Sequence, residues 1–122
     1  MLSKAYDHCV IVYTQEEWEK VAAQLASQPS NIAANRRLNR LTFAGSYPSQ
    51  LDRSGRVLIP PQLRQYAGLG EDIVLVGAGQ TFEIWDRAAW QHERSTLDEQ
   101  AAEIAEAGAS AQRTSAAGGD GS

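Results

Sequence analysis

The residues with the clearest chemical potential surround one tight turn in the stretch LDRSGRVLIPPQLRQYAGL, residues 51–69. The Asp52 carboxylate can accept hydrogen bonds from backbone N–H groups near Ser54 and Gly55, which is the geometry of an Asx turn. Gly55 can adopt the positive φ that such a turn requires. The pattern therefore predicts a hairpin in which Asp52 and Gly55 form the turn and Arg56 lies at its mouth.

The guanidinium of Arg56 has two interpretations at this position. An arginine on a strand can make bidentate contacts with a guanine edge or with a phosphate. Alternatively, Arg56 pairs with Asp52 and stabilises the turn without any ligand, and a surface ion pair of that kind is worth about 0–1 kcal/mol. The residues alone leave both interpretations open.

Charge is distributed unevenly along the chain. The 122 residues carry a net charge of −4, but residues 36–64 hold six arginines and a single acid, a local charge of +5. The remaining residues include 5 basic and 14 acidic ones, a charge of −9. A basic middle segment with acidic flanks is a candidate anion-binding surface, including one for nucleic acid. The alternative is that these arginines are dispersed around helices and a hairpin.

Other kinds of site find little support in the sequence. If Asp7, His8 and Cys9 are strand residues, neighbours point to opposite faces, so His8 and Cys9 cannot easily act on each other. We therefore expect no enzyme or metal site, and hence no small-molecule substrate. The glycines of GAGQTF precede a strand, whereas a phosphate-binding loop precedes a helix, so they indicate a hairpin turn. A single cysteine cannot form an internal disulfide, which fits a reducing cytoplasm.

Membrane insertion is also not expected. The longest apolar runs, such as CVIVY and IVLV, have four to five residues, whereas a membrane span needs roughly 18 to 20. The first residues, MLSKAYDHC, contain no long apolar segment typical of a secretory signal.

Periodicity and capping residues predict the elements that position the turn. Thr14 and Glu17 form a capping box that starts a helix after a strand at residues 9–13. A second helix is predicted at about residues 31–43, with Ser30 as its cap. A short helix should follow Pro60-Pro61 and end at Gly68. A last helix should begin after Asp86, which is its predicted cap. Further strands are predicted at 56–59, 72–77 and 81–85. The small, polar residues from 108 onward predict disorder.

Two segments of the chain resemble each other. CVIVYTQEEW, residues 9–18, and TFEIWDRAAW, residues 81–90, both give a strand, an aromatic residue, a helix cap and a tryptophan at an offset of 72 residues. A hairpin, a short helix and a strand precede the second copy, but eight residues precede the first. The chain is thus interpreted as one complete unit and the end of another. We expect the reading frame to continue upstream of Met1 and to encode a second turn of the same type.

The hairpin sequence LDRSGRVLIP resembles the Asp-x-x-Gly-Arg-(apolar)3-Pro signature of the SpoVT-AbrB superfamily. In order, DHCVIVYTQEEWEKV, RRLNRLTFAGS, LIPPQLRQYAGL and IVLVGAGQTFEIWDRAAW resemble segments of the MraZ family, over about residues 5–90. The resemblance implies an α+β fold, namely half of a swapped-hairpin (SpoVT-AbrB-like) β-barrel with flanking helices. In this interpretation the first of the two related units is incomplete. Residues 1–44 would be the remnant of a first unit, 45–107 a complete second unit, and 108–122 a disordered tail.

The resemblance also implies a function. It implies a sequence-specific DNA-binding transcriptional regulator of the division and cell-wall gene cluster type, cytoplasmic and nucleoid-associated, without a cofactor. Ring-shaped homo-oligomers would bind promoter repeats in double-stranded DNA. Arg56 would contact DNA, Asp52 and Gly55 would form the turn, and Arg53 would contact phosphate. The alternative is a protein-interaction or oligomerisation module that has lost DNA binding through truncation.

Three further arginines, Arg36, Arg37 and Arg40, lie on the predicted second helix. In the resembling family this helix packs between the two halves. We expect these arginines to pair with acids of neighbouring helices or subunits rather than to bind DNA.

Overall fold

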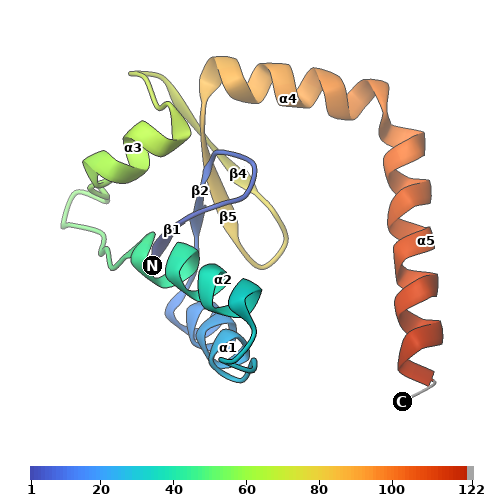
Figure 1. Ribbon diagram of the computed structural model, residues 1–122. Helices are drawn as coiled ribbons and strands as arrows, with labels where there is room; N and C mark the ends of the chain where they lie inside the picture. The colour runs from blue at the N-terminus through green and yellow to red at the C-terminus, as the bar shows by residue number, and fades with distance from the viewer. Residues whose placement is uncertain (121–122) are drawn as a thin grey trace. The chain divides into compact units, whose positions relative to one another are not determined.

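The computed structural model describes the backbone of residues 1–120 and the side chains of residues 1–110. The chain divides into two compact units, Met1–Arg87 and Ala88–Ser122. The first unit combines a five-stranded antiparallel sheet with helices, and helices also make up the described part of the second. This mixture confirms the predicted α+β class (Figure 1). The swapped-hairpin half-barrel and the three-part division of the chain stay predictions.

The sheet has the strand order β3-β1-β2-β5-β4, and neighbouring strands are antiparallel. Its strands are β1 Leu2–Lys4, β2 Val10–Val12, β3 Ser46–Tyr47, β4 Ile73–Gly77 and β5 Phe82–Asp86. Strands β2, β4 and β5 were predicted from the sequence. Strand β1 was not predicted, because three residues are too few to show the alternation by which strands are recognised.

The centre of the sheet is the pair formed by β2 and β5. In its register Ile11 lies opposite Glu83, and these residues are separated by the same 72 positions that separate the two similar sequence segments. An antiparallel pair centred on two equivalent residues relates its strands by a local two-fold axis. The strand residues 10–12 and 82–84 of the two similar segments therefore lie side by side, in opposite directions, within the sheet.

Helices α1 Gln15–Ala26 and α2 Ala33–Ala44 follow β2 and pack against each other. The Thr14 side chain accepts a hydrogen bond from the Glu17 N–H at 3.2 Å, which confirms the predicted cap of α1. Trp18 of α1 meets Phe43 of α2 edge-on at 5.9 Å. Ile32, not Ser30 as predicted, occupies the N-cap position of α2, and its side chain makes no capping hydrogen bond.

Helix α3, Pro61–Ala67, attaches the hairpin region to the sheet. It begins after Pro60 and ends at Gly68, whose φ is 61°, as the sequence predicts. Leu63 is fully buried and packs with Leu2 and Val10 in the core. The burial of Leu63 is favourable because apolar side chains leave water, at about 25 cal/mol per Å² of apolar surface.

The strand predicted at residues 56–59 is not formed. Residues 48–60 are irregular apart from the turn at the hairpin tip. Leu51 and Leu58 are exposed, and the strand pairs of the described residues include none with residues 48–60, so the hairpin arms lack the neighbouring strand that would stabilise a strand there. A suitable sequence pattern is insufficient for strand formation without such a neighbour.

The second unit contains most of α4, Arg87–Glu99, and all of α5, Ala101–Asp120. The sequence predicts disorder from residue 108 onward, whereas the backbone is helical there up to Asp120. Alanine is the best helix former, so an alanine-rich polar segment can be helical although it lacks an apolar stripe. Residues 121–122 of the predicted tail lie outside the described residues. Among the residues described, no helix has the length and apolar character of a membrane span.

Candidate functional site

The predicted turn is present, and one carboxylate oxygen organises it. Oδ1 of Asp52 accepts hydrogen bonds from the backbone N–H groups of Ser54 and Arg56, each at 2.8 Å. The prediction of an Asx turn is thus confirmed, although the second donor is Arg56 rather than Gly55. The Asp52 N–H also donates to the Arg56 carbonyl at 2.9 Å, and this bond closes the loop.

Gly55 has a φ of 76°, in the left-handed region that glycine tolerates best. Its N–H donates to the Asp52 carbonyl at 3.0 Å. A Cβ at this position would meet no atom within 4 Å. Glycine is therefore required here by backbone conformation and not by lack of space.

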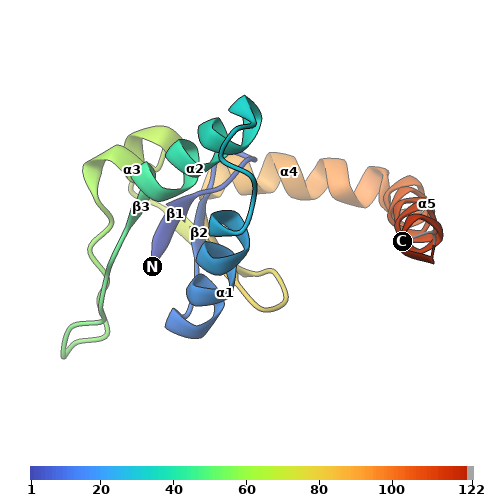
Figure 2. The ribbon, with the colours of Figure 1, turned by 60° about the horizontal axis from the view of Figure 1, so that its bottom comes forward.

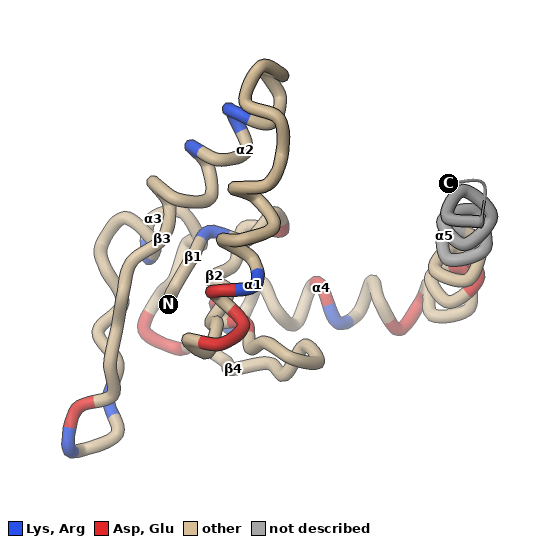
Figure 3. The backbone as a smooth tube through the Cα atoms, turned by 90° about the horizontal axis from the view of Figure 1, so that it is seen from below, with Lys and Arg blue, Asp and Glu red and all other residues tan. Residues whose placement is uncertain are grey.

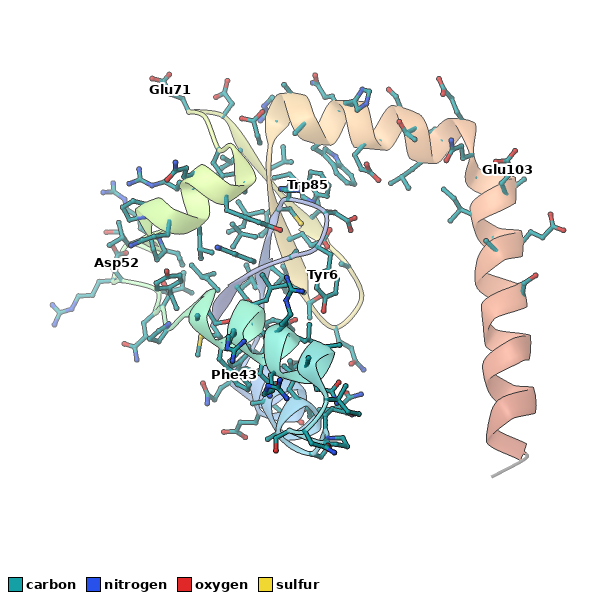
Figure 4. The ribbon with its side chains drawn as sticks, in the orientation of Figure 1. Tyr6, Phe43, Asp52, Glu71, Trp85 and Glu103 are labelled. Atoms are coloured by element: carbon teal, nitrogen blue, oxygen red, sulfur yellow. The ribbon has the colours of Figure 1, made fainter. Side chains whose placement is uncertain are left out.

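The arginine side chains of the turn are exposed. Among the described residues, neither the Arg53 nor the Arg56 guanidinium has a hydrogen-bond or ion-pair partner. The Asp52–Arg56 ion pair considered from the sequence is thus not formed, because the Asp52 carboxylate binds backbone N–H groups. Figures 2 and 3 show the hairpin tip projecting away from the sheet, and Figure 4 labels Asp52 at this tip. Both guanidiniums are free to bind an external anion.

The positive charge is local to one part of the first unit. Residues 1–87 contain nine basic and nine acidic residues, so the unit as a whole is neutral. Six of the basic residues lie on α2, on the hairpin and on α3, where Asp52 is the single acid among residues 36–64. In Figure 3 the acidic positions gather instead on other parts of the chain, such as α1. This separation of charge favours anions at the hairpin side.

The cysteine and its neighbours have the properties of a structural cluster. Cys9 is fully buried, and burial, together with the charges of Glu83 and Asp7, raises the pKa of its thiol to about 12. His8 lies in a turn with a φ of 57°, and its exposed ring stacks on Tyr66 at 5.0 Å. The prediction that His8 is a strand residue is therefore wrong. A protonated, buried thiol is a poor nucleophile.

Other candidate chemistry is also lacking in the described part of the chain. No group of three or more histidine, cysteine or acidic side chains there could hold a metal ion. The Ala78 N–H donates to the Thr81 carbonyl at 2.9 Å, and Gly79 has a φ of 86°. Gly77 ends β4 and Gly79 lies in the turn between β4 and β5, which confirms the predicted hairpin turn.

An apolar groove of about 550 Å³ lies between the hairpin arms and the sheet, and we call it the hairpin groove. Its walls include Leu51 and Val57 from the hairpin, and Leu75 and Phe82 from β4 and β5. These four side chains are exposed. The groove was not predicted from the sequence, because it depends on how the hairpin arms lie against the strands β1, β2, β4 and β5. The sequence signal that could have indicated the groove is the set of apolar side chains on the predicted strands.

The geometry defines the class of site first: unpaired arginines on a preformed turn make an anion-binding surface. Comparison with known families agrees with the sequence resemblance. Residues 42–113 match the family described as "MraZ protein, putative antitoxin-like". The chain belongs to the MraZ family.

Several relatives carry the name "Transcriptional regulator MraZ". One from Coxiella burnetii (strain RSA 493 / Nine Mile phase I) is 44% identical over 88 residues, which are 72% of this chain and 58% of the relative. One from Thioalkalivibrio sulfidiphilus is 43% identical over 100 residues, 82% of this chain and 67% of the relative. One from Roseiflexus castenholzii is 36% identical over 106 residues, 87% of this chain and 74% of the relative. The chain thus spans 58% of the length of the Coxiella protein.

Proposed function

We propose that the chain is a sequence-specific DNA-binding transcriptional regulator of the division and cell-wall gene cluster type. Its ligand is double-stranded DNA carrying promoter repeats. The observation that carries this proposal is the free guanidinium of Arg56 on a turn that Asp52 holds in place. The names of the relatives support the same role, since those proteins are called transcriptional regulators.

The hairpin residues have different roles in this proposal. Arg56 follows the turn directly and contacts a base edge, where a bidentate arginine–guanine contact contributes about 1–3 kcal/mol of discrimination. Arg53 lies inside the turn and contacts phosphate, which contributes affinity but little sequence preference. Asp52 and Gly55 fix the backbone before DNA binds, so less conformational entropy is lost on binding.

The assembly belongs to the same proposal. We place two SpoVT-AbrB-like units in the chain, with residues 45–107 forming the second, in a swapped-hairpin arrangement whose first half is incomplete. The register of Ile11 with Glu83 supports a pair of related units, because it relates the two similar segments by a local two-fold axis. Several copies form a ring, and the regulator acts in the cytoplasm at the nucleoid.

A gel-shift titration with promoter DNA from the division and cell-wall gene cluster tests the role of Arg56. Arg56→Ala should weaken specific binding by about 1–3 kcal/mol, or roughly 5- to 150-fold. Arg94→Ala is the matched control, because Arg94 is an exposed arginine on α4 outside the basic segment. Equal affinity of the wild type and Arg56→Ala for the promoter would contradict the proposed contact.

The hairpin groove favours a second candidate function, a protein-interaction or oligomerisation module without DNA binding. Its exposed apolar walls could bind another chain, as apolar surface patches often do. The salt dependence of DNA binding distinguishes the two candidate functions. Affinity for DNA falls steeply with salt because phosphate contacts release counterions, whereas a purely protein-binding module would retain no DNA at any salt concentration.

A further inference from the structure

Helix α2 carries a second set of arginines, Arg36, Arg37 and Arg40, on its exposed side. At 100° per residue these three positions fall within one 100° arc of the helix. The partly buried residues of α2 lie on the opposite side (Asn35, Leu38, Asn39 and Thr42). The arginines thus share a face that the fold leaves to solvent, which we call the α2 basic face.

Acids of the neighbouring helix do not neutralise this face, in contrast to the expectation from the sequence. Helix α1 packs against α2, but its Glu16 and Glu17 contact Lys20 of their own helix, at 3.9 and 3.2 Å. Arg36 donates to the Ser30 carbonyl at 2.9 Å. Within the described part of the chain, the Arg37 and Arg40 guanidiniums have neither a hydrogen bond nor an ion pair.

This arrangement is unfavourable for an isolated helix. Like charges at positions i and i+4, such as Arg36 and Arg40, destabilise a helix instead of stabilising it. Cations near the helix N-terminus also oppose the helix dipole, and α2 has no acid in its first turn. An external anion would relieve both effects, because it would supply the negative charge that the chain does not.

We propose that the α2 basic face is a second DNA-contact surface that binds backbone phosphates through Arg37 and Arg40. The inference rests on the proposed function, since it assigns DNA as the polyanion. It also separates two tasks: the hairpin arginine reads sequence, and the α2 basic face contributes affinity for any duplex. Arginine suits this task because its guanidinium binds phosphate with two parallel hydrogen bonds.

The test measures binding to two duplexes, promoter DNA and a duplex of unrelated sequence, between 50 and 200 mM salt. Each lost phosphate contact reduces the slope of log K against log salt by about 0.9. Raising the salt over this range should therefore weaken binding of the double variant Arg37→Gln/Arg40→Gln less than binding of the wild type. For both duplexes, the factor by which affinity falls should be about tenfold smaller in the variant. Arg37→Lys/Arg40→Lys should retain most of the slope. The matched control is Lys20→Gln, which removes an exposed cation of α1.

The outcomes distinguish this inference from the proposed function. An unchanged slope in the glutamine variant, while Arg56→Ala loses promoter binding, would overturn the inference and leave the proposed function intact. A smaller slope in the glutamine variant, with no effect of Arg56→Ala, would support the α2 basic face and contradict the hairpin contact. Light scattering on the same variants tests for a protein partner: a smaller oligomer with unchanged DNA affinity would show that the arginines contact a subunit and would overturn the inference.

Discussion

At the scale of single residues, Asp52 determines the shape of the hairpin tip. Its Oδ1 holds two N–H groups on either side of Gly55, so loss of the carboxylate frees the turn without disturbing the core. We expect Asp52→Ala to weaken promoter binding roughly tenfold, because side chain–backbone hydrogen bonds are each worth about 0.5–1.5 kcal/mol. Global stability should change little, since the turn is exposed. Gel-shift and urea titrations measure the two effects.

Asp52→Asn is the control for that substitution. Asparagine keeps an oxygen that can accept both hydrogen bonds but lacks the charge, so its DNA affinity should lie between those of the wild type and Asp52→Ala. If asparagine were as harmful as alanine, the charge of Asp52 rather than its role as an acceptor would be responsible. A large loss of stability in either variant would show that the turn supports the core.

Cys9 makes the stability of the fold dependent on alkaline pH. Burial raises the pKa of its thiol from the ordinary value of 9.0 to about 12. Between these values the unfolded chain releases a proton that the folded chain retains, so the free energy of unfolding falls as pH rises. The slope should approach about 1.4 kcal/mol per pH unit. The contribution of the protonated thiol to the free energy of unfolding is therefore complete below pH 9 and is lost by about pH 12.

Urea titrations at several pH values between 8 and 11.5 measure this slope. Cys9→Ala should be less stable at pH 8, because it leaves a small cavity, but its stability should decrease less steeply with pH. The pKa values of Tyr13 and Tyr66 are also raised, first by burial, so a shallower decrease should remain. If the free energy of unfolding fell equally steeply with pH in the wild type and in Cys9→Ala, the thiol would not contribute to the pH dependence.

At the scale of elements, α3 connects the hairpin to the sheet. Leu63 of α3 is fully buried, whereas Leu58 of the preceding arm is 82% exposed. Leu63→Ala should lower the free energy of unfolding by about 2–5 kcal/mol, because it removes core contacts and leaves a cavity. Leu58→Ala should change it by less than about 0.5 kcal/mol. Denaturant titrations of both variants test the contrast, and similar losses would mean that the arm also packs in solution.

Much of this arrangement follows from local rules in the sequence. The Thr14 cap, the proline start of α3 and the Asp52 turn each depend on a few neighbouring residues, and each was predicted. Strand β1 was not predicted, and the strand predicted at residues 56–59 is not formed. Both errors arise because a strand depends on partners distant in the sequence. The free guanidiniums of α2 could not be inferred either, since pairing of Arg37 or Arg40 depends on how α1 lies beside them.

At the scale of the first unit, the sheet has an apolar edge at β4. This strand pairs with β5 on one side only, so its other side presents unpaired backbone groups. Ile73, Leu75 and Phe82 are exposed beside it and line the hairpin groove. An open edge next to an apolar groove is a common site of association between chains. The basic hairpin and this edge therefore give the unit two surfaces with different chemistry.

The open β4 edge should promote self-association of the chain. The wild-type chain should be oligomeric at micromolar concentration, and Leu75→Lys should shift it towards monomer, because lysine on an edge strand opposes pairing between sheets. Leu75 is 67% exposed, so the substitution should leave the fold intact, which circular dichroism checks. Gln91→Lys on α4 adds the same charge at another exposed position. Light scattering after size exclusion gives the masses, and a folded wild-type monomer would contradict the prediction.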